Sequence, residues 1–284
     1  MSLPLPALEA SPGAAGRMKE HVRRACGYPV TLVMASSSVD AHFRARCRTC
    51  AEQEGPQIVA TPMIVAIDGP SGTGKSSTSK AVAVKLGLSY LDTGAQYRAM
   101  TWWMLTNGID VEDACAVATA VDKPVIVSGT DPSAPTITVD GADATGPIRT
   151  QTVTAAVSTV SAVPEVRARL VRLQRAAAAS APEGIVVEGR DIGTTVLPDA
   201  AVKIFLTASP EARAARRNGE LKGGEATSLE ATREALVERD AADSGRAASP
   251  LAKADDAVEV DTTQLSLEQV VECVVALVEE RTSR

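Results

Sequence analysis

The sequence predicts an α/β fold in which helices cover a mainly parallel central sheet. Short apolar runs with the length of buried strands recur along the chain, and they alternate with helical patterns. Of the 284 residues, 45% are hydrophobic and 23% are charged, which is typical of a globular protein with a sizeable core. Only 2% are aromatic, so the core must be built mainly from Ala, Val, Leu and Ile.

The first apolar run, residues 64–68, predicts a buried strand. A glycine-rich turn follows at residues 69–76. Residues 76–86 then predict a helix, with Val82 and Leu86 four residues apart on one face. These segments together predict a strand–turn–helix unit.

Three later apolar runs predict further strands, at residues 185–187, 202–206 and 257–260. The first two are each followed by a polar turn and a helical pattern, as expected for a parallel sheet. Ser266, with Gln269 three residues later, has the spacing of a capping box and predicts the start of the last helix.

One region interrupts the alternation of strands and helices. Residues 125–127 and 136–139 are rich in β-branched residues, and residues 129–132 between them have turn chemistry. We expect a hairpin here, forming a small subdomain inserted into the α/β fold. A helical stretch follows at residues 151–180, in which Pro164 marks a break or a first helical residue.

The glycine-rich turn matches the phosphate-loop pattern G-x-x-x-x-G-K-[ST] in full. Glycines let backbone N–H groups converge on phosphate oxygens, and the helix N-terminus adds a partial positive charge. Lys75 would reach the terminal phosphates of a nucleoside triphosphate, and the Ser76 hydroxyl would bind Mg²⁺. A turn that binds nothing is disfavoured by the Lys-Ser pair and the strand–helix context. The predicted ATP-binding residues of the loop are Gly69, Pro70, Ser71, Gly72, Thr73, Gly74, Lys75, Ser76 and Ser77.

Three classes of protein share this loop: GTPases, mechanical ATPases and small-molecule kinases. The guanine motif Asn-Lys-x-Asp is absent, since Asn107 and Asn218 each precede a glycine. A motor ATPase usually has a strand that ends in Asp-Glu, whereas the nearest strand here ends in Glu188-Gly189. Residues 63–284 contain no histidine, which excludes histidine catalysis there. A small-molecule kinase is therefore favoured.

Further segments agree in order and spacing with one family of such kinases. They are residues 91–98 (Leu-Asp-Thr-Gly-Ala-Gln-Tyr-Arg), 148–151, 187–193 (Val-Glu-Gly-Arg-Asp-Ile-Gly), 205–208, and 238–240 (Glu-Arg-Asp) running to Asp243 and Arg246. With the phosphate loop, they closely resemble the bacterial cytidylate (CMP) kinases over about residues 63–284.

The resemblance implies a three-layer P-loop kinase fold with a parallel central sheet. It identifies the inserted hairpin as a monophosphate-binding subdomain at about residues 124–148, and it adds a lid region at about 213–246 whose mobile part spans about 218–228. The implied reaction transfers the γ-phosphoryl group of ATP to CMP or dCMP, with Mg²⁺ as cofactor.

The resemblance also implies site residues, position by position. Thr93, Arg98 and Arg190 fall on residues that contact the acceptor phosphate, and Ser158, Arg167 and Asp191 fall on residues that hold the cytosine edge. Arg239, Asp243 and Arg246 fall on the acceptor side, at its phosphate and ribose. Arg213 and Arg216 would contact ATP, and Lys75, Arg190 and Arg217 would be catalytic.

The chemistry of these residue types agrees with a cytosine acceptor. Cytosine presents an exocyclic amine that Asp191 can accept from, and acceptors that Arg167 and Ser158 can donate to. Uracil has O4 in place of the amine, so UMP should be a poor acceptor. Phosphoryl transfer needs positioning and charge neutralisation, and we expect no essential catalytic base because the acceptor phosphate is already an anion.

Some of these assignments have a plain structural alternative. Arg98 could be a surface arginine and Asp243 a surface acid, and Ser158 could face a neighbouring helix. The three arginines at 213, 216 and 217 could form one solvated helix face. Gln96 departs from the family, which usually has an apolar residue there.

The first 62 residues resemble no part of the kinase. They carry a net charge of +2, against −8 for the remainder. We expect a flexible extension, or a start codon assigned upstream of a natural start at Met63. Less favoured alternatives are a partner-binding arm and a zinc site on Cys26, His42, Cys47 and Cys50. Cys115 and Cys273 are expected to be buried in helices.

Two other functions stay open on the sequence: a P-loop kinase for another monophosphate, and a nucleotide-binding regulator without turnover. The acidic balance argues against nucleic acid as a partner, and no apolar run reaches the length of a membrane helix. An odd number of unevenly spaced cysteines points to a reducing cytoplasm. We expect a monomer that binds only small nucleotides.

Overall fold

The structure is a computed structural model that describes residues 62–220 and 228–282. Residues 61–284 form one compact unit, to which everything below refers. The four residues of the zinc alternative lie outside the described residues, as do residues 221–227 in the middle of the predicted lid.

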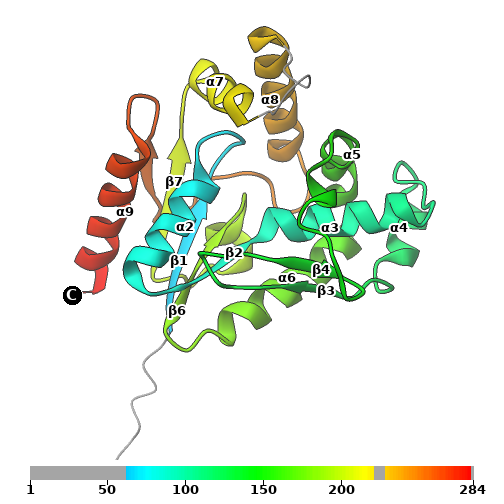
Figure 1. The fold of residues 1–284 in the computed structure, drawn as a ribbon, viewed down its shortest axis with the longest axis horizontal. Coiled ribbons are helices and arrows are strands. Elements are labelled where there is room, and N and C mark those ends of the chain that lie inside the picture. Colours follow the sequence, from blue (N-terminus) through cyan, green and yellow to red (C-terminus); the bar gives the residue numbers. More distant parts are fainter. Residues whose placement is uncertain (1–61, 221–227, 283–284) are drawn as a thin grey trace, which may run out of the picture. The chain divides into compact units, whose positions relative to one another are not determined.

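Strands and helices are interspersed along this unit (Figure 1). The strands are β1 (Met63–Asp68), β2 (Ser89–Asp92), β3 (Ile126–Ser128), β4 (Ile137–Val139), β5 (Ala142–Asp143), β6 (Gly184–Glu188), β7 (Val202–Thr207) and β8 (Val258–Asp261). The helices are α2 (Lys75–Leu86), α3 (Thr93–Thr106), α4 (Ala114–Ala120), α5 (Gln151–Ala162), α6 (Pro164–Ala179), α7 (Pro210–Glu220), α8 (Leu229–Ser244) and α9 (Leu267–Thr282), with short turns η1 (Pro147–Arg149) and η2 (Ile192–Val196).

The central sheet has the strand order β2-β6-β1-β7-β8, and every neighbouring pair is parallel. Val65 in the middle strand lies opposite Val186 on one side and Val202 on the other. The predicted parallel α/β sheet is confirmed. Sequence analysis missed β2, because only Tyr90 and Leu91 of its four residues are buried and so short a segment shows no period.

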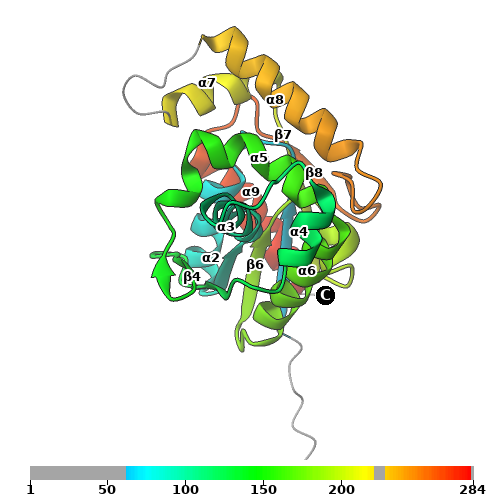
Figure 2. The ribbon, with the colours of Figure 1, turned by 90° about the vertical axis from the view of Figure 1, so that its right-hand side faces the viewer.

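Alternate residues of the strands pack against different helices, which gives three layers. Val65 and Ile67 belong to a cluster with residues of α2 and α9. Ala66 and Val187 belong to a cluster on the opposite face, with the end of α6 and with η2. The period of two along β1 thus places one helical layer on each face of the sheet (Figures 1 and 2).

The inserted subdomain is a three-stranded antiparallel sheet of β3, β4 and β5. Its inward residues Ile126, Ile137 and Val139 join a cluster built from α3, α4, α5 and α6. The predicted hairpin is confirmed, and β5 is an additional strand of two exposed residues that no apolar pattern marks.

Two predicted helix boundaries are confirmed and one prediction about packing is wrong. Pro164 is the first residue of α6, and Ser266 and Gln269 exchange the two hydrogen bonds of a capping box. Cys115 and Cys273, however, are exposed. Helix α9 buries Val270, Val271, Val274, Val275 and Val278, so its apolar face leaves Cys273 on the other side.

Helices α7 and α8 belong to the predicted lid region and pack against each other. They lie side by side at the carboxyl ends of β1 and β7, beyond the phosphate loop (Figures 1 and 2). Helix α8 also contacts α5. This placement brings the lid region next to both the loop and α5.

Candidate active site

The phosphate loop joins β1 to α2, and two of its glycines are required by the backbone. Gly69 has a φ of 144°, and a Cβ there would lie 2.2 Å from the carbonyl oxygen of Leu206. Gly74 precedes α2 as its N-cap with a φ of 89°. Both conformations are unfavourable for residues with a side chain, so these positions explain the glycines of the pattern.

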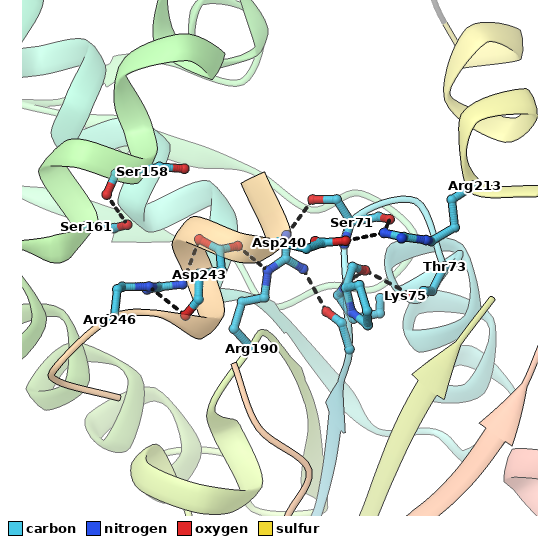
Figure 3. A network of polar contacts seen from close by, with 12 residues as sticks. Ser71, Thr73, Lys75, Ser158, Ser161, Arg190, Arg213, Asp240, Asp243 and Arg246 are labelled. Carbon is cyan, nitrogen blue, oxygen red and sulfur yellow. Dashed lines mark hydrogen bonds and ion pairs between the residues drawn. The ribbon is translucent and has the colours of Figure 1, made fainter. Parts of the chain in front are cut away.

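Three cations donate to the loop's own carbonyl oxygens (Figure 3). The Nζ atom of Lys75 lies 2.6 Å from the oxygen of Pro70. Nη1 of Arg190 lies 2.7 Å from the oxygen of Gly69, and Nη1 of Arg213 lies 3.1 Å from that of Ser71. Burial, and then the charge of Arg190, lower the pKa of Lys75 to about 7. A polyanion at this loop would meet two guanidinium charges and would favour the charged form of the Lys75 amine.

An aspartate of α8 also contacts the loop, and sequence analysis assigned it no role. The backbone N–H of Ser71 donates to Oδ1 of Asp240 at 3.2 Å, and Asp240 forms an ion pair with Arg213. The carboxylate of Asp240 therefore accepts a hydrogen bond from one of the loop's N–H groups, which in such loops bind the oxygens of anions. Its position next to Arg239 was visible in the sequence, but its contact depends on how α8 lies over the loop.

Carboxylates line the ends of the neighbouring strands. Asp68, at the end of β1, accepts from the N–H groups of Ile192 and Gly193, and burial raises its pKa to about 6. Glu188, at the end of β6, accepts from the Tyr90 hydroxyl, and burial raises its pKa to about 7. The sequence placed Glu188 at the end of a strand but did not indicate that its side chain is buried.

The first residue of α3 lies against the same strand end. The hydroxyl of Thr93 donates to the backbone oxygen of Glu188 at 2.7 Å, and its side chain is buried. The N-cap of this helix, Asp92, accepts from the N–H of Ala95. These contacts fix the start of α3, which carries the next positive charge of the site, Arg98.

Four arginines from different elements lie near one another beside the loop. This arginine group consists of Arg98, Arg190, Arg217 and Arg239. Burial, and then the charges of Arg239 and Arg217, lower the pKa of Arg98 to about 9. Burial, and then the charge of Arg190, lower the pKa of Arg239 to about 10. Arg98 also donates to Oγ1 of Thr154 at 2.8 Å. An anion bound here would offset the repulsion between these like charges in a partly buried site.

Asp243 joins this arginine group to the end of α8. Its Oδ2 lies 2.8 Å from Nε of Arg190, and its Oδ1 lies 2.7 Å from Nη2 of Arg246. Only 4% of Asp243 is exposed, so the alternative of a surface acid is wrong. Arg190 thus contacts both the phosphate loop and Asp243, as Figure 3 shows.

On the side of α5 and α6, Arg167 and Asp191 form a buried ion pair. Nη2 of Arg167 lies 2.5 Å from Oδ2 of Asp191, and each residue is 4% exposed. Nη1 of Arg167 donates to the oxygen of Ser161 at 3.4 Å. The Ser161 hydroxyl in turn donates to the backbone oxygen of the half-buried Ser158 at 3.0 Å.

Comparison with known proteins decides the family. A model of the cytidylate kinase family matches residues 65–280. A protein named cytidylate kinase from Streptomyces griseus subsp. griseus is 78% identical over 217 residues, which cover 76% of this chain and 93% of that protein. Cytidylate kinases from Streptomyces coelicolor and Nocardia farcinica are 74% and 53% identical, over 81% and 75% of this chain and 98% and 91% of theirs.

The chain belongs to the cytidylate kinase family. All of the site residues predicted from that family's motifs lie within the matched range. The structure describes every one of them.

The three arginines of α7 in this cytidylate kinase family member do not form one solvated face. Arg213 is 6% exposed and contacts the loop. Arg216 donates to Oγ1 of Thr262 at 2.9 Å, and Thr262 donates to the oxygen of Thr73. Arg217 lies near Arg98 and Arg239. One helix therefore directs charge to both the loop and the arginine group.

Gln96, the departure from the family pattern, is 3% exposed on α3. Its Nε2 donates to the hydroxyl of Ser128 at 3.0 Å, which joins α3 to the inserted sheet. Within residues 62–220 and 228–282, no helix has the length and apolarity to cross a bilayer.

Proposed function

We propose that this chain transfers the γ-phosphoryl group of ATP to the phosphate of CMP or dCMP, giving CDP or dCDP and ADP. One observation carries the proposal: Arg190 contacts the phosphate loop with one nitrogen and the acceptor-side Asp243 with another. A donor phosphate on the loop and an acceptor phosphate among the arginines would thus meet at this side chain. The relatives' printed name, cytidylate kinase, supports the same reading.

ATP would bind through the loop and α7. The N–H groups of the loop and the dipole of α2 would hold the phosphates, with Lys75 moving from the Pro70 oxygen to the terminal phosphates. Arg213 and Arg216 would approach ATP from α7. The residues proposed for ATP are Gly69, Pro70, Ser71, Gly72, Thr73, Gly74, Lys75, Ser76, Ser77, Arg213 and Arg216.

The chain's donor set fits Mg²⁺ bound mainly through substrate phosphates. The Ser76 hydroxyl at the start of α2 is exposed and would hold the ion, with the carboxylate of Glu188 behind it. Mg²⁺ in such sites keeps several waters and needs only one or two protein oxygens. When bound, it neutralises the charge that develops on the β- and γ-phosphates.

The acceptor would lie with its phosphate among the arginines. Thr93, Arg98, Arg190 and Arg239 would contact that phosphate, and Asp243 and Arg246 would lie on its ribose side. Because burial and neighbouring arginine charges lower the pKa of Arg98 and of Arg239, an anion would be bound strongly there. Bidentate guanidinium contacts would also fix the direction of the attacking oxygen.

The transfer itself is an in-line displacement. An oxygen of the acceptor phosphate attacks the γ-phosphorus, and the bond from that phosphorus to the β-phosphate oxygen breaks. Lys75, Arg190 and Arg217 would stabilise the charge on the transferring group. The acceptor oxygen is already anionic, so no residue has to remove a proton.

Base selection would rest on the Arg167–Asp191 pair and Ser158. The pair uses Oδ2 of Asp191, and Oδ1 would accept from the exocyclic amine of cytosine. Arg167 and Ser158 would donate to the ring acceptors. With UMP, the carboxylate would face O4 of uracil, which leaves two acceptors opposed in a buried site.

The proposal is tested by ADP formation with the full chain, Mg²⁺, ATP and each of CMP, dCMP, UMP, AMP, GMP and dTMP. We expect turnover with CMP and dCMP well above that with UMP. Turnover with a different monophosphate would keep the ATP site but reject the base assignment. CMP binding without any ADP would indicate a nucleotide-binding regulator.

The remaining parts of the proposal rest on the sequence. They are a cytoplasmic enzyme, a monomer, and nucleotides rather than nucleic acid as its binding partners. Sedimentation of the full chain with and without CMP tests the monomer, and a dimer at micromolar concentration would contradict it.

A further inference from the structure

The ring of Tyr97 lies under the guanidinium of Arg167. The central carbon of the guanidinium is 5.3 Å from the ring centroid, within the range of a cation–π contact. Tyr97 is 9% exposed and Arg167 is 4% exposed, so solvent barely reaches the contact. Such contacts are stronger in desolvated surroundings than at exposed sites.

The other partners of Arg167 act at its nitrogens. Asp191 binds Nη2 and the oxygen of Ser161 accepts from Nη1. Hydrogen bonds at two nitrogens set the direction of the guanidinium, and a ring against its face limits rotation out of that plane. The N–H donors of the Arg167 guanidinium are then held in one position and one orientation.

The hydroxyl of Tyr97 has a different environment from its ring. Burial raises the pKa of Tyr97 to about 12, while Arg167 and Gln174 are among the neighbours that lower it. Gln174 is 0% exposed and lies two turns after Arg167 on α6. Among the described residues, the hydroxyl has no hydrogen-bond partner of normal geometry. The ring, and not the hydroxyl, is therefore what contacts the guanidinium.

We propose that Tyr97 is a positioning residue for base selection, whose ring fixes the plane of Arg167 so that the Arg167–Asp191 pair presents a donor and an acceptor to cytosine. The inference rests on the proposed function, since it requires CMP as the acceptor. Tyr97 itself makes no contact with the substrate in this account.

The test compares Tyr97→Leu with Tyr97→Phe in the full chain. The readout is kcat/KM for CMP divided by kcat/KM for UMP, with ATP and Mg²⁺ saturating. Loss of the ring should lower this ratio roughly tenfold, mainly through a higher KM for CMP. The phenylalanine variant keeps the ring and should stay within about threefold of the wild-type ratio. The KM for ATP should not change in either variant.

Met104→Ala is the matched control. Met104 is fully buried, lies two turns after Tyr97 on α3 and belongs to the same apolar cluster. Its truncation removes core packing from the same helix and the same cluster, and the CMP/UMP ratio should stay at the wild-type value. If Tyr97→Leu does not fold, Tyr97→Met replaces it, since methionine fills an irregular space without a ring.

An unchanged CMP/UMP ratio in a folded ring-less variant would overturn the inference, and so would an equal loss in Met104→Ala. A wild-type chain that does not prefer CMP would instead reject the proposed function, which separates the two failures. A double variant sharpens the result: with Arg167→Met already present, Tyr97→Leu should lower the ratio no further.

Discussion

The phosphate loop and the Arg167–Asp191 pair are built in opposite ways. The loop is one continuous segment, and its N–H and carbonyl groups contact Asp240, Lys75 and Arg190. The pair comes from α6 and the turn between β6 and η2, and its two members contact each other directly in a buried site. ATP would have to exchange the loop's internal partners for phosphates, whereas cytosine would meet a pair that is already formed.

This difference implies that turnover and acceptor choice can be changed separately. A substitution in the loop should slow transfer to every acceptor by the same factor. A substitution in the pair should alter which acceptor is preferred and leave the loop's affinity for ATP unchanged.

The largest effect is expected for Lys75→Met. Loss of this charge should lower kcat by roughly a thousandfold with CMP and UMP alike, because the charge acts on the transferring group and not on the base. CMP binding, measured by calorimetry, should stay within a fewfold of wild type. Lys85→Met is the control, since Lys85 is exposed in the last turn of the same helix. A change in the CMP/UMP ratio would show that the loop and the pair are not separable.

A smaller effect is expected on the free energy of unfolding, through Asp68 at the end of β1. The pKa of Asp68 is raised from 3.8 to about 6, so the folded chain binds more protons than the unfolded chain between these values. Protonation of Asp68 therefore stabilises the folded chain at low pH, and this stabilisation is lost as the pH rises through about 6. Between pH 4.5 and 7 the wild type should lose roughly 2 kcal/mol relative to Asp68→Asn. Urea unfolding of both chains at the two pH values measures it, and parallel pH profiles would refute the assignment.

The smallest effect is expected for Asp240→Asn. The carboxylate on the N–H of Ser71 competes with a phosphate for that group, so removing its charge should lower the KM for ATP about threefold to fivefold. Glu238→Gln, an exposed acid in the same turn of α8, serves as the control. A higher KM for ATP in Asp240→Asn would mean that Asp240 instead orients Arg213 toward the nucleotide.

The sequence was sufficient for the loop because its pattern is local, and for the sheet because buried strands are apolar runs. It was not sufficient for β2, whose four residues are too few for a period, nor for Cys273, whose side of α9 depends on which face is buried. The partners of Asp240 and Tyr97 depend on the packing of α8 and α6, and no spacing in the chain reveals them. The family resemblance supplied residues of the site, but not which of them contact each other.

The central claim, that Asp191 selects cytosine, is tested most directly by Asp191→Asn. An asparagine can donate to O4 of uracil, where the carboxylate can only accept. The measurement is kcat/KM for CMP and for UMP in wild type and variant. The account predicts that a preference for CMP of roughly a hundredfold or more falls to near equality, with the KM for ATP unchanged. A variant that prefers CMP as strongly as the wild type would contradict it.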